Sequence, residues 1–407
     1  MENPLQGNVN KYYTFELLIH FVFYTPVFVI FLLSKNLSLT QITLIFSIHS
    51  LGALIFDLPG GVFADYFTKK LSLIVGSVLW GLSLLSYAFI GYFWQFCLAA
   101  FIGGIGQGFL SGADRALIHE TLRLLGRETE YKKVEGRVRG INEIVAGAGV
   151  LLGGFIGAIS LPLTLIASAA SVGLSAACSL FFKNPPKDKE STSSPAREIL
   201  STSVGILKNN RQVLWLTLYL AVFVAFVWAT NILSQPYLKS INVPTAYFGL
   251  IFSGFSIFYA LSSIYAHKLD RYITKKFFLL FASIVPLTLI LIGTIPGIIA
   301  FLSWVFLGIF ETANWTLVSS EILRIVPKHQ STTILSFQSL TLRLINITIS
   351  PLVGISADRF GIYRTLQLNG VALLAALAAL AFASVKMADF KNVDKKSAGD
   401  PEPIPTR

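Results

Sequence analysis

Long apolar runs alternate with short polar segments along almost the whole chain. Twelve runs are recognisable, at about residues 12–33, 41–64, 71–91, 94–118, 139–160, 163–182, 212–236, 246–266, 277–294, 297–321, 332–355 and 366–385. Each has about the 20 residues that a helix needs to cross roughly 30 Å of hydrocarbon. The pattern predicts an all-α integral membrane protein with twelve transmembrane helices.

Composition indicates the same class. Of the 407 residues, 54% are hydrophobic and 13% are charged, and the mean hydropathy is +0.68. A soluble protein of this length could not bury so much apolar surface in one or two cores. The two cysteines lie inside apolar runs, the five histidines show no metal-ligand spacing, and no nucleophile-elbow or phosphate-loop pattern occurs. We therefore expect no disulfide, metal, cofactor or enzymatic activity.

Polar segments divide the chain into four parts. Residues 183–211 are charged and rich in Ser and Pro, which is typical of a solvated linker. The linker separates an N-terminal six-helix bundle at residues 1–182 from a C-terminal one at residues 212–385. Residues 386–407 are predicted to be a disordered tail. The opening segment MENPLQGNVN lacks the basic region and cleavage site of a signal peptide, so the first span is expected to be retained.

Lysine and arginine are distributed unevenly between the two sides. When both termini are placed on one side, most of the 32 basic residues lie in segments on that side, and the opposite loops contain only Lys35, Lys239, Arg359 and Arg364. The positive-inside rule makes the first side cytoplasmic. The net charge of +11 is then spread over loops that face anionic lipid, which argues against nucleic-acid binding. We expect a monomer in the plasma membrane (the bacterial inner membrane), with both termini cytoplasmic.

Weak internal repeats relate the two halves. Thr68-Lys69-Lys70 matches Thr274-Lys275-Lys276 at an offset of 206 residues. HETLRLLG at residues 119–126 matches SEILRIVP at 320–327, and GVLLG at 149–153 matches SPLVG at 350–354, both at an offset of 201. Together they predict two copies of one six-helix unit, arranged pseudo-symmetrically around a central site.

The segment GGVFADYFTKK at residues 60–70 resembles the loop between helices two and three of the major facilitator superfamily. The matching positions are Gly61, Asp65, Lys69 and Lys70, whereas Tyr66 and Thr68 depart from the pattern. SGADRALIHETL at 111–122 and YKKVEGR at 131–137 resemble a bacterial branch of that family with many drug-type exporters. The resemblance covers about residues 12–385 and implies transport by alternating access between two rocking bundles.

The same resemblance implies a gate at the cytoplasmic end. Gly60 and Gly61 are expected to let the second helix approach a neighbour closely. Asp65, with Lys69 and Lys70 nearby, is expected to hold the N-terminus of a facing helix when the inner gate is shut. An ordinary charged loop that only sets topology is the alternative.

Two positions depart from family signatures that concern proton exchange. Ala100 stands where an arginine precedes the glycine run of helix four, and Val150 replaces proline in GVLLGG of helix five. Both departures weaken the case for the family's standard proton-antiport mechanism, although they leave transport itself untouched.

Ionisable residues inside spans form two candidate groups, because each costs about 2.5–3.5 kcal/mol to insert and rarely persists unpaired. The first group is close to the cytoplasmic side and consists of Asp57, Asp114, Arg115 and Glu143. A packed ion network that braces the first bundle is favoured over a substrate role for it. The second group, His20 and Glu311, lies about 12–15 Å from the inner boundary, by the helical rise.

The helices that line the cavity in the superfamily are one, four, seven and ten. Around His20 and Glu311 we expect the further candidates Gln107, Asn231, Asn314, Trp228 and Trp315. Glu311 is the first candidate for proton coupling or cation recognition, and a static pair with Arg343 is the alternative. His20 is either a second proton-binding group or a helix-packing residue.

These observations favour a proton-coupled secondary transporter that exports an amphipathic or cationic small organic solute. Uptake of a nutrient or an iron-chelating metabolite is the alternative within transport. A non-transporting receptor is the alternative of another class. A receptor is expected to carry a signalling domain, and the predicted tail at residues 386–407 is too short for one. An integral enzyme acting on lipid would need a clustered nucleophile and base, which the sequence does not offer.

Overall fold

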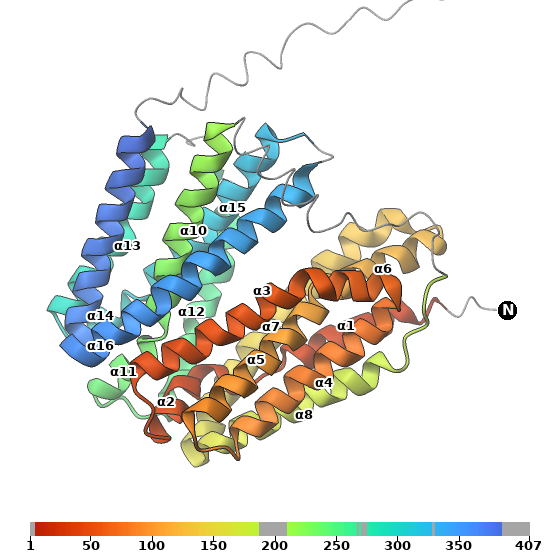
Figure 1. Ribbon diagram of the computed structural model, residues 1–407, viewed down its shortest axis with the longest axis horizontal. Coiled ribbons are helices and arrows are strands. Elements are labelled where there is room, and N and C mark those ends of the chain that lie inside the picture. The colour runs from red at the N-terminus through yellow and green to blue at the C-terminus, as the bar shows by residue number, and fades with distance from the viewer. Residues whose placement is uncertain (1–4, 187–209, 267, 270–274, 328–329, 385–407) are drawn as a thin grey trace, which may run out of the picture.

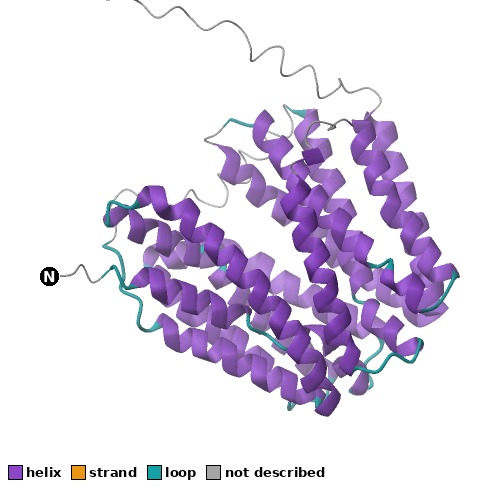
Figure 2. Cartoon of the chain, turned by 180° about the vertical axis from the view of Figure 1, so that it is seen from behind, coloured by secondary structure: helices purple, strands orange, loops and turns teal. Residues whose placement is uncertain are grey.

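The computed structural model describes residues 5–186, 210–266, 268–269, 275–327 and 330–384. Every regular element in these ranges is a helix, as Figure 2 shows. Most of the expected linker (187–209), the expected tail, and Thr274 of the repeat lie outside the described residues. The side chains of Lys275 and Lys276 do so as well.

Eleven described helical segments are long and apolar enough to cross a membrane. They account for all twelve predicted runs, because the last segment contains two of them. This segment is α16, Ser331–Ser384, and it turns at Gly361, whose φ of 78° and ψ of 168° are not helical. Glycine adopts a positive φ without steric penalty, so the chain reverses there within one apparent helix. The prediction of an all-α membrane protein is therefore confirmed.

The first six spans are formed by the helices up to Ser179, which we call the N-half. Short signals set their ends: a 3₁₀ turn at Thr25–Val27 with Pro26 breaks the first span, and Ser38 caps the second in a capping box with Gln41. Gly112, at φ 75°, separates the two helices of the fourth span. The helices are α1 (Asn8–His20), α2 (Phe28–Ser34), α3 (Leu39–Tyr66), α4 (Lys69–Tyr87), α5 (Phe93–Leu110), α6 (Ala113–Leu124), α7 (Tyr131–Ile159) and α8 (Leu161–Ser179).

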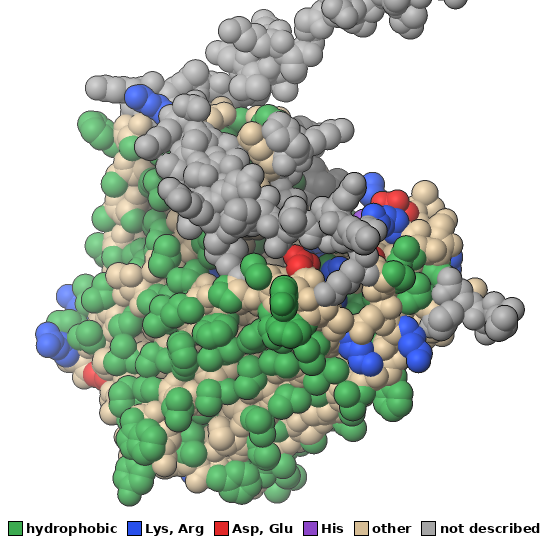
Figure 3. All heavy atoms as spheres, turned by 45° about the vertical axis from the view of Figure 1, so that its right-hand side comes forward, with side chains coloured by type: hydrophobic (Ala, Val, Ile, Leu, Met, Phe, Trp, Pro, Cys, Tyr) green, Lys and Arg blue, Asp and Glu red, His purple; other side chains and the backbone are tan. Residues whose placement is uncertain are grey.

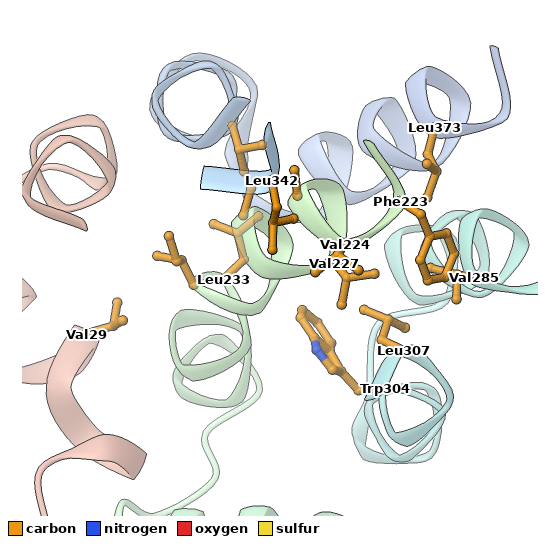
Figure 4. Packing of buried hydrophobic residues seen from close by; sticks show 14 of the residues in the cluster. Val29, Phe223, Val224, Val227, Leu233, Val285, Trp304, Leu307, Leu342 and Leu373 are labelled. Atoms are coloured by element: carbon orange, nitrogen blue, oxygen red, sulfur yellow. The ribbon is translucent and has the colours of Figure 1, made fainter. Parts of the chain in front are cut away.

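The remaining helices form the C-half. They are α10 (Arg211–Asn231), α11 (Ser234–Ser240), α12 (Ala246–Tyr265), α13 (Lys275–Thr294), α14 (Ile298–Leu302), α15 (Val305–Ile325) and α16. The core of the C-half forms around α10. Figure 4 shows Val224 and Val227 of α10 among side chains from the surrounding helices, including Trp304, which is 1% exposed. Burial on all sides explains why the apolar pattern of this span is almost continuous.

The two halves diverge from a common end, as Figure 1 shows. We call this the distal end; it holds the turns after α2, after α11 and at Gly361. The opposite, terminal end holds residues 5, 186, 210 and 384. On the face in Figure 3, apolar side chains cover a broad band and charged side chains gather toward its margins. That distribution is typical of a surface in contact with lipid.

Small residues allow the halves to touch closely at the distal end. A Cβ atom built on Gly154 of α7 would lie 2.5 Å from the backbone nitrogen of Gly249 on α12. One built on Gly354 of α16 would lie 2.8 Å from the carbonyl oxygen of Leu39 on α3. Only glycine permits such backbone approach, so α7 packs along α12 and α3 packs along α16.

Candidate functional site

A cavity of about 470 Å³ lies between the halves, and both halves line it. Its walls are rich in aromatic residues and carry no charged side chain among the lining residues. Tyr24, Phe28 and Phe46 come from the N-half, and the aromatic residues of the C-half that line it are Trp228, Phe252, Phe255, Tyr259 and Trp304. Concave, mostly apolar sites of this size suit small organic molecules.

Amide and hydroxyl groups interrupt the aromatic wall of this central cavity. The Asn231 side-chain oxygen accepts a hydrogen bond of 2.8 Å from Trp304 Nε1. The Asn346 amide nitrogen donates to the Ala225 carbonyl oxygen at 3.4 Å, and Ser350 Oγ donates to Asn346 at 3.3 Å. These groups can orient a polar part of a bound molecule, while the rings contact its apolar part.

Glu311 lies immediately behind the cavity wall. Trp228 Nε1 donates a 2.5 Å hydrogen bond to Glu311 Oε1, and the Trp228 side chain, 41% exposed, lines the cavity. Glu311 itself is half-buried and is not among the lining residues, so Trp228 is its link to the cavity wall. In the described part of the chain Glu311 forms no ion pair with Arg343, which instead lines a second cavity whose other walls belong to the N-half.

A second cavity, of about 360 Å³, contains His20, Gln107 and Arg343. Most of its lining comes from the N-half, whereas Arg343 reaches it from α16 of the C-half. His20 Nδ1 lies 2.9 Å from the carbonyl oxygen of Glu16 and 3.5 Å from its carboxylate. The structure therefore separates His20 from Glu311, which the sequence placed in one group: each is associated with a different cavity.

The expected ion network of the first bundle is present in part: Asp114 and Arg115 lie in it, together with residues that the sequence did not single out. Arg115 Nε lies 3.2 Å from Glu135, which also accepts a 3.1 Å hydrogen bond from the Tyr12 hydroxyl. Asn142 donates to Glu16 at 2.8 Å. Asp114 lines the same second cavity. Glu16 is separated from His20 by one helical turn, a spacing that could have indicated it in the sequence.

Two residues assigned to that network do not belong to it. Asp57 makes no hydrogen bond or ion pair with another described residue, and Glu143 is exposed and likewise unpaired in the described part of the chain. Helical rotation explains the error. On α7, Glu135, Arg139 and Asn142 share the cavity face, whereas Glu143 is turned away from it by one further residue.

Two further candidates lie away from both cavities. Asn314 is fully buried; its side-chain oxygen accepts from the Tyr219 hydroxyl at 2.6 Å, and its amide donates to the Phe310 carbonyl at 2.9 Å. It therefore ties α15 to α10 inside the C-half. Trp315 is 37% exposed and is not among the residues that line the two cavities.

The loop motif after α3 is only partly engaged. Lys69 forms a 2.5 Å ion pair with Glu120 of α6, and Lys70 donates to the Leu180 carbonyl at 2.6 Å. Asp65 makes no hydrogen bond or ion pair with another described residue. Gly60 packs against the backbone of Gly108 as expected, but nothing lies within 4 Å of a Cβ built on Gly61. The close approach expected of Gly61 is therefore wrong, because that side of α3 faces open space.

Asp65 was expected to accept hydrogen bonds from the N-terminus of a facing helix. Contacts of this kind are found at the distal end, made by residues that the sequence did not single out. The Asp358 carboxylate of α16 accepts hydrogen bonds from the backbone of Leu39 at 2.9 Å and Thr40 at 2.8 Å. Gln235 of α11 accepts from the backbone of Val29 at 2.8 Å and Ile30 at 3.3 Å. Both side chains join the C-half to the start of an N-half helix.

Comparisons with solved structures identify the same architecture. A bacterial homolog of the human lysosomal transporter Spinster, in an inward-facing and unoccupied conformation, aligns with a TM-score of 0.77 over 99% of this chain and 100% of its own, at 16% identity. The nucleoside transporter NupG aligns with a TM-score of 0.71 at 15% identity over 97% of this chain and 99% of its own. The D-xylose-proton symporter aligns at 0.69 and 16% identity, over 93% and 97%.

Sequence comparisons define the family. A hexuronate transporter of Bacillus subtilis (strain 168) is 36% identical over 84 residues, which is 21% of this chain and only a fifth of the relative's length. The family model described as "Major Facilitator Superfamily" matches residues 15–345. This range covers most of the chain and spans both halves. The chain is a multi-pass membrane protein of the Major Facilitator Superfamily, whose members are secondary transporters rather than enzymes or receptors.

Proposed function

We propose that this protein moves an amphipathic small organic solute across the bacterial inner membrane by alternating access, coupled to protons and in the direction of efflux. The observation that carries the proposal is the central cavity, which both halves line and whose aromatic wall is interrupted by amides. A solute held there contacts both halves at once. Rocking of the halves then exposes the solute first on one side and then on the other.

The conformation supports this cycle. The hydrogen bonds from Gln235 and Asp358, and the glycine contacts, join the halves at the distal end. The terminal end carries the basic loops, which the positive-inside rule makes cytoplasmic. On this orientation the protein is closed to the outside and its termini are cytoplasmic. The same assignment explains why the Asp65 latch, expected when the inner gate is shut, is not engaged.

We assign proton coupling to Glu311. Trp228 lines the central cavity and donates a hydrogen bond to the Glu311 carboxylate, so a solute that displaces the indole also removes that hydrogen bond. A cationic or amphipathic solute then meets a carboxylate and aromatic faces together, which is a favourable environment for organic cations. A cationic solute and a proton would then compete for the same carboxylate, as export by exchange requires.

A second candidate is uptake of an anionic sugar acid. The partial likeness to a hexuronate transporter favours it, as does the second cavity, where Arg343 from the C-half faces His20 and Gln107 of the N-half. An arginine can bind a carboxylate through two parallel hydrogen bonds. In this case the solute would bind closer to the terminal end than an amphipathic cation in the central cavity.

Transport in liposomes tests both candidates. The protein is reconstituted with an internal pH dye, and a lipophilic quaternary ammonium ion, D-glucuronate, a nucleoside and D-xylose are added in turn. We expect the quaternary ammonium ion to change the internal pH in proteoliposomes and not in protein-free liposomes. A pH change with D-glucuronate alone would establish the second candidate. Failure of every solute to change the pH or to accumulate would contradict proton-coupled transport of these classes.

A further inference from the structure

Gln235 belongs to the distal closure and to the central cavity at the same time. Its side chain is 7% exposed, and the exposed part lines the cavity. Its Oε1 accepts from the backbone nitrogens of Val29 and Ile30 at 2.8 and 3.3 Å, and its Nε2 donates to the Thr25 carbonyl at 2.9 Å. Every one of these partners lies in the N-half, so these three hydrogen bonds of the Gln235 amide join the two halves.

The partners need Gln235 because the first span is broken beside it. The 3₁₀ turn at Thr25–Val27 ends the preceding stretch, and α2 begins at Phe28. The first N–H groups of a helix have no carbonyl partner within the helix. Val29 and Ile30 are 3% and 5% exposed, so water does not replace that partner. Loss of the Gln235 amide would leave two buried donors unsatisfied.

Asp358 offers a comparison within the same closure. It accepts hydrogen bonds from Leu39 and Thr40 at the start of α3, as Gln235 does at the start of α2. It is not among the residues that line the central cavity. A bound solute can therefore reach one of these two cross-half contacts and not the other.

We propose that Gln235 detects a solute in the central cavity and releases the distal closure. A solute that carries a hydroxyl, amide or carboxyl group competes for the side-chain amide and removes it from Thr25, Val29 and Ile30. The free energy needed to open the distal end is then lower, because the backbone groups of Thr25, Val29 and Ile30 have already lost their partner. A solute of the same size without such groups fills the cavity and leaves the closure intact. The inference rests on the proposed transport cycle and adds a requirement on solute chemistry.

The experiment places a defined group beside Gln235, so that no solute needs to be known. Asn231 is exposed to the central cavity and lies four residues before Gln235. In a Cys97→Ala, Cys178→Ala background, Asn231→Cys is alkylated with iodoacetamide, which attaches a small amide. A parallel sample is treated with methyl methanethiosulfonate, which attaches an apolar methylthio group through a disulfide bond. Hydrogen–deuterium exchange is then followed in peptides that cover residues 28–33 and 39–41.

We expect the attached amide to speed exchange at residues 28–33 by about fivefold relative to the attached methylthio group, since one net hydrogen bond contributes about that factor. Exchange at residues 39–41 should rise with it, because the whole distal end opens. In Gln235→Leu and Gln235→Met the two adducts should exchange alike. In Asp358→Asn exchange at 39–41 should rise for both adducts, and the difference between them should persist.

Equal exchange of the two adducts in the protein with Gln235 would overturn the proposal. So would a difference that persists in both Gln235→Leu and Gln235→Met. The measurement is made in detergent and requires no transport. Its failure is therefore separate from failure of the liposome assay, which concerns the proposed function itself.

Discussion

Glu311→Gln is expected to abolish proton-driven accumulation of solute and to preserve exchange of solute for solute. Glutamine keeps an oxygen that can accept the hydrogen bond from Trp228 Nε1, but it binds no proton in the range that drives transport. With one proton coupled to one solute, a pH difference of one unit sustains a solute gradient of at most about tenfold. In the variant this gradient should fall to unity.

Accumulation and counterflow in proteoliposomes check the result, and Glu143→Gln is the matched control. Glu143 is also a carboxylate on a membrane-spanning helix, but it is exposed and has no partner among the described residues. The control should accumulate solute like the unsubstituted protein. Transport by Glu311→Gln at the original rate with unchanged pH dependence would remove Glu311 as the proton carrier.

Gly104→Val should have the largest effect on stability. A Cβ built on Gly104 of α5 would overlap the His49 carbonyl oxygen and would lie 2.9 Å from the Ala53 nitrogen of α3. These atoms belong to the backbone of a neighbouring helix, so no side chain can turn away to make room. Overpacking of a core typically costs about 1–3 kcal/mol. We expect a cost at or above the top of that range.

Thermal unfolding in detergent measures this cost, and Gly173→Val provides the comparison. Gly173 also lies inside a helix, α8, but nothing lies within 4 Å of a Cβ built on it. The two substitutions share the intrinsic helix propensities of Gly and Val, so the difference between them reports helix packing. Equal melting temperatures for the two variants would contradict the prediction, because they would mean that α3 and α5 move apart to accommodate valine without a loss of stability.

Much of the site depended on helical rotation, which sequence spacing alone did not resolve. The expected network of the first bundle named α6 and α7 correctly, yet on α7 it included Glu143 and missed Glu135, and it took Asp57 of α3 in place of Glu16 of α1. A shift of one residue turns a side chain by about 100° around a helix but moves it only about 1.5 Å along the axis. A residue can therefore be predicted at the right position along a helix and on the wrong face of it. The same reason separates Asn314, which is buried in the C-half, from Asn231, which lines the central cavity.

Contacts between the halves were the hardest feature to predict. Asp358 follows an apolar run and resembles an ordinary loop acid, and Gln235 resembles an ordinary polar residue near a span end. Their partners lie more than 200 positions away along the chain. Backbone N–H groups are present at every helix start, so the sequence carries no signal for which start a side chain will cap.

The sequence by itself determined the number of spans, the all-α class and the family. Those properties follow from local apolar length and from short motifs, because a bilayer forces each segment to satisfy its own backbone. Only the tertiary structure decided that Trp228 donates a hydrogen bond to Glu311, that Arg343 crosses to the other half, and that Gln235 and Asp358 close the distal end. Each of these depends on how two helix bundles meet, and that is set by the packing of distant residues rather than by any single segment.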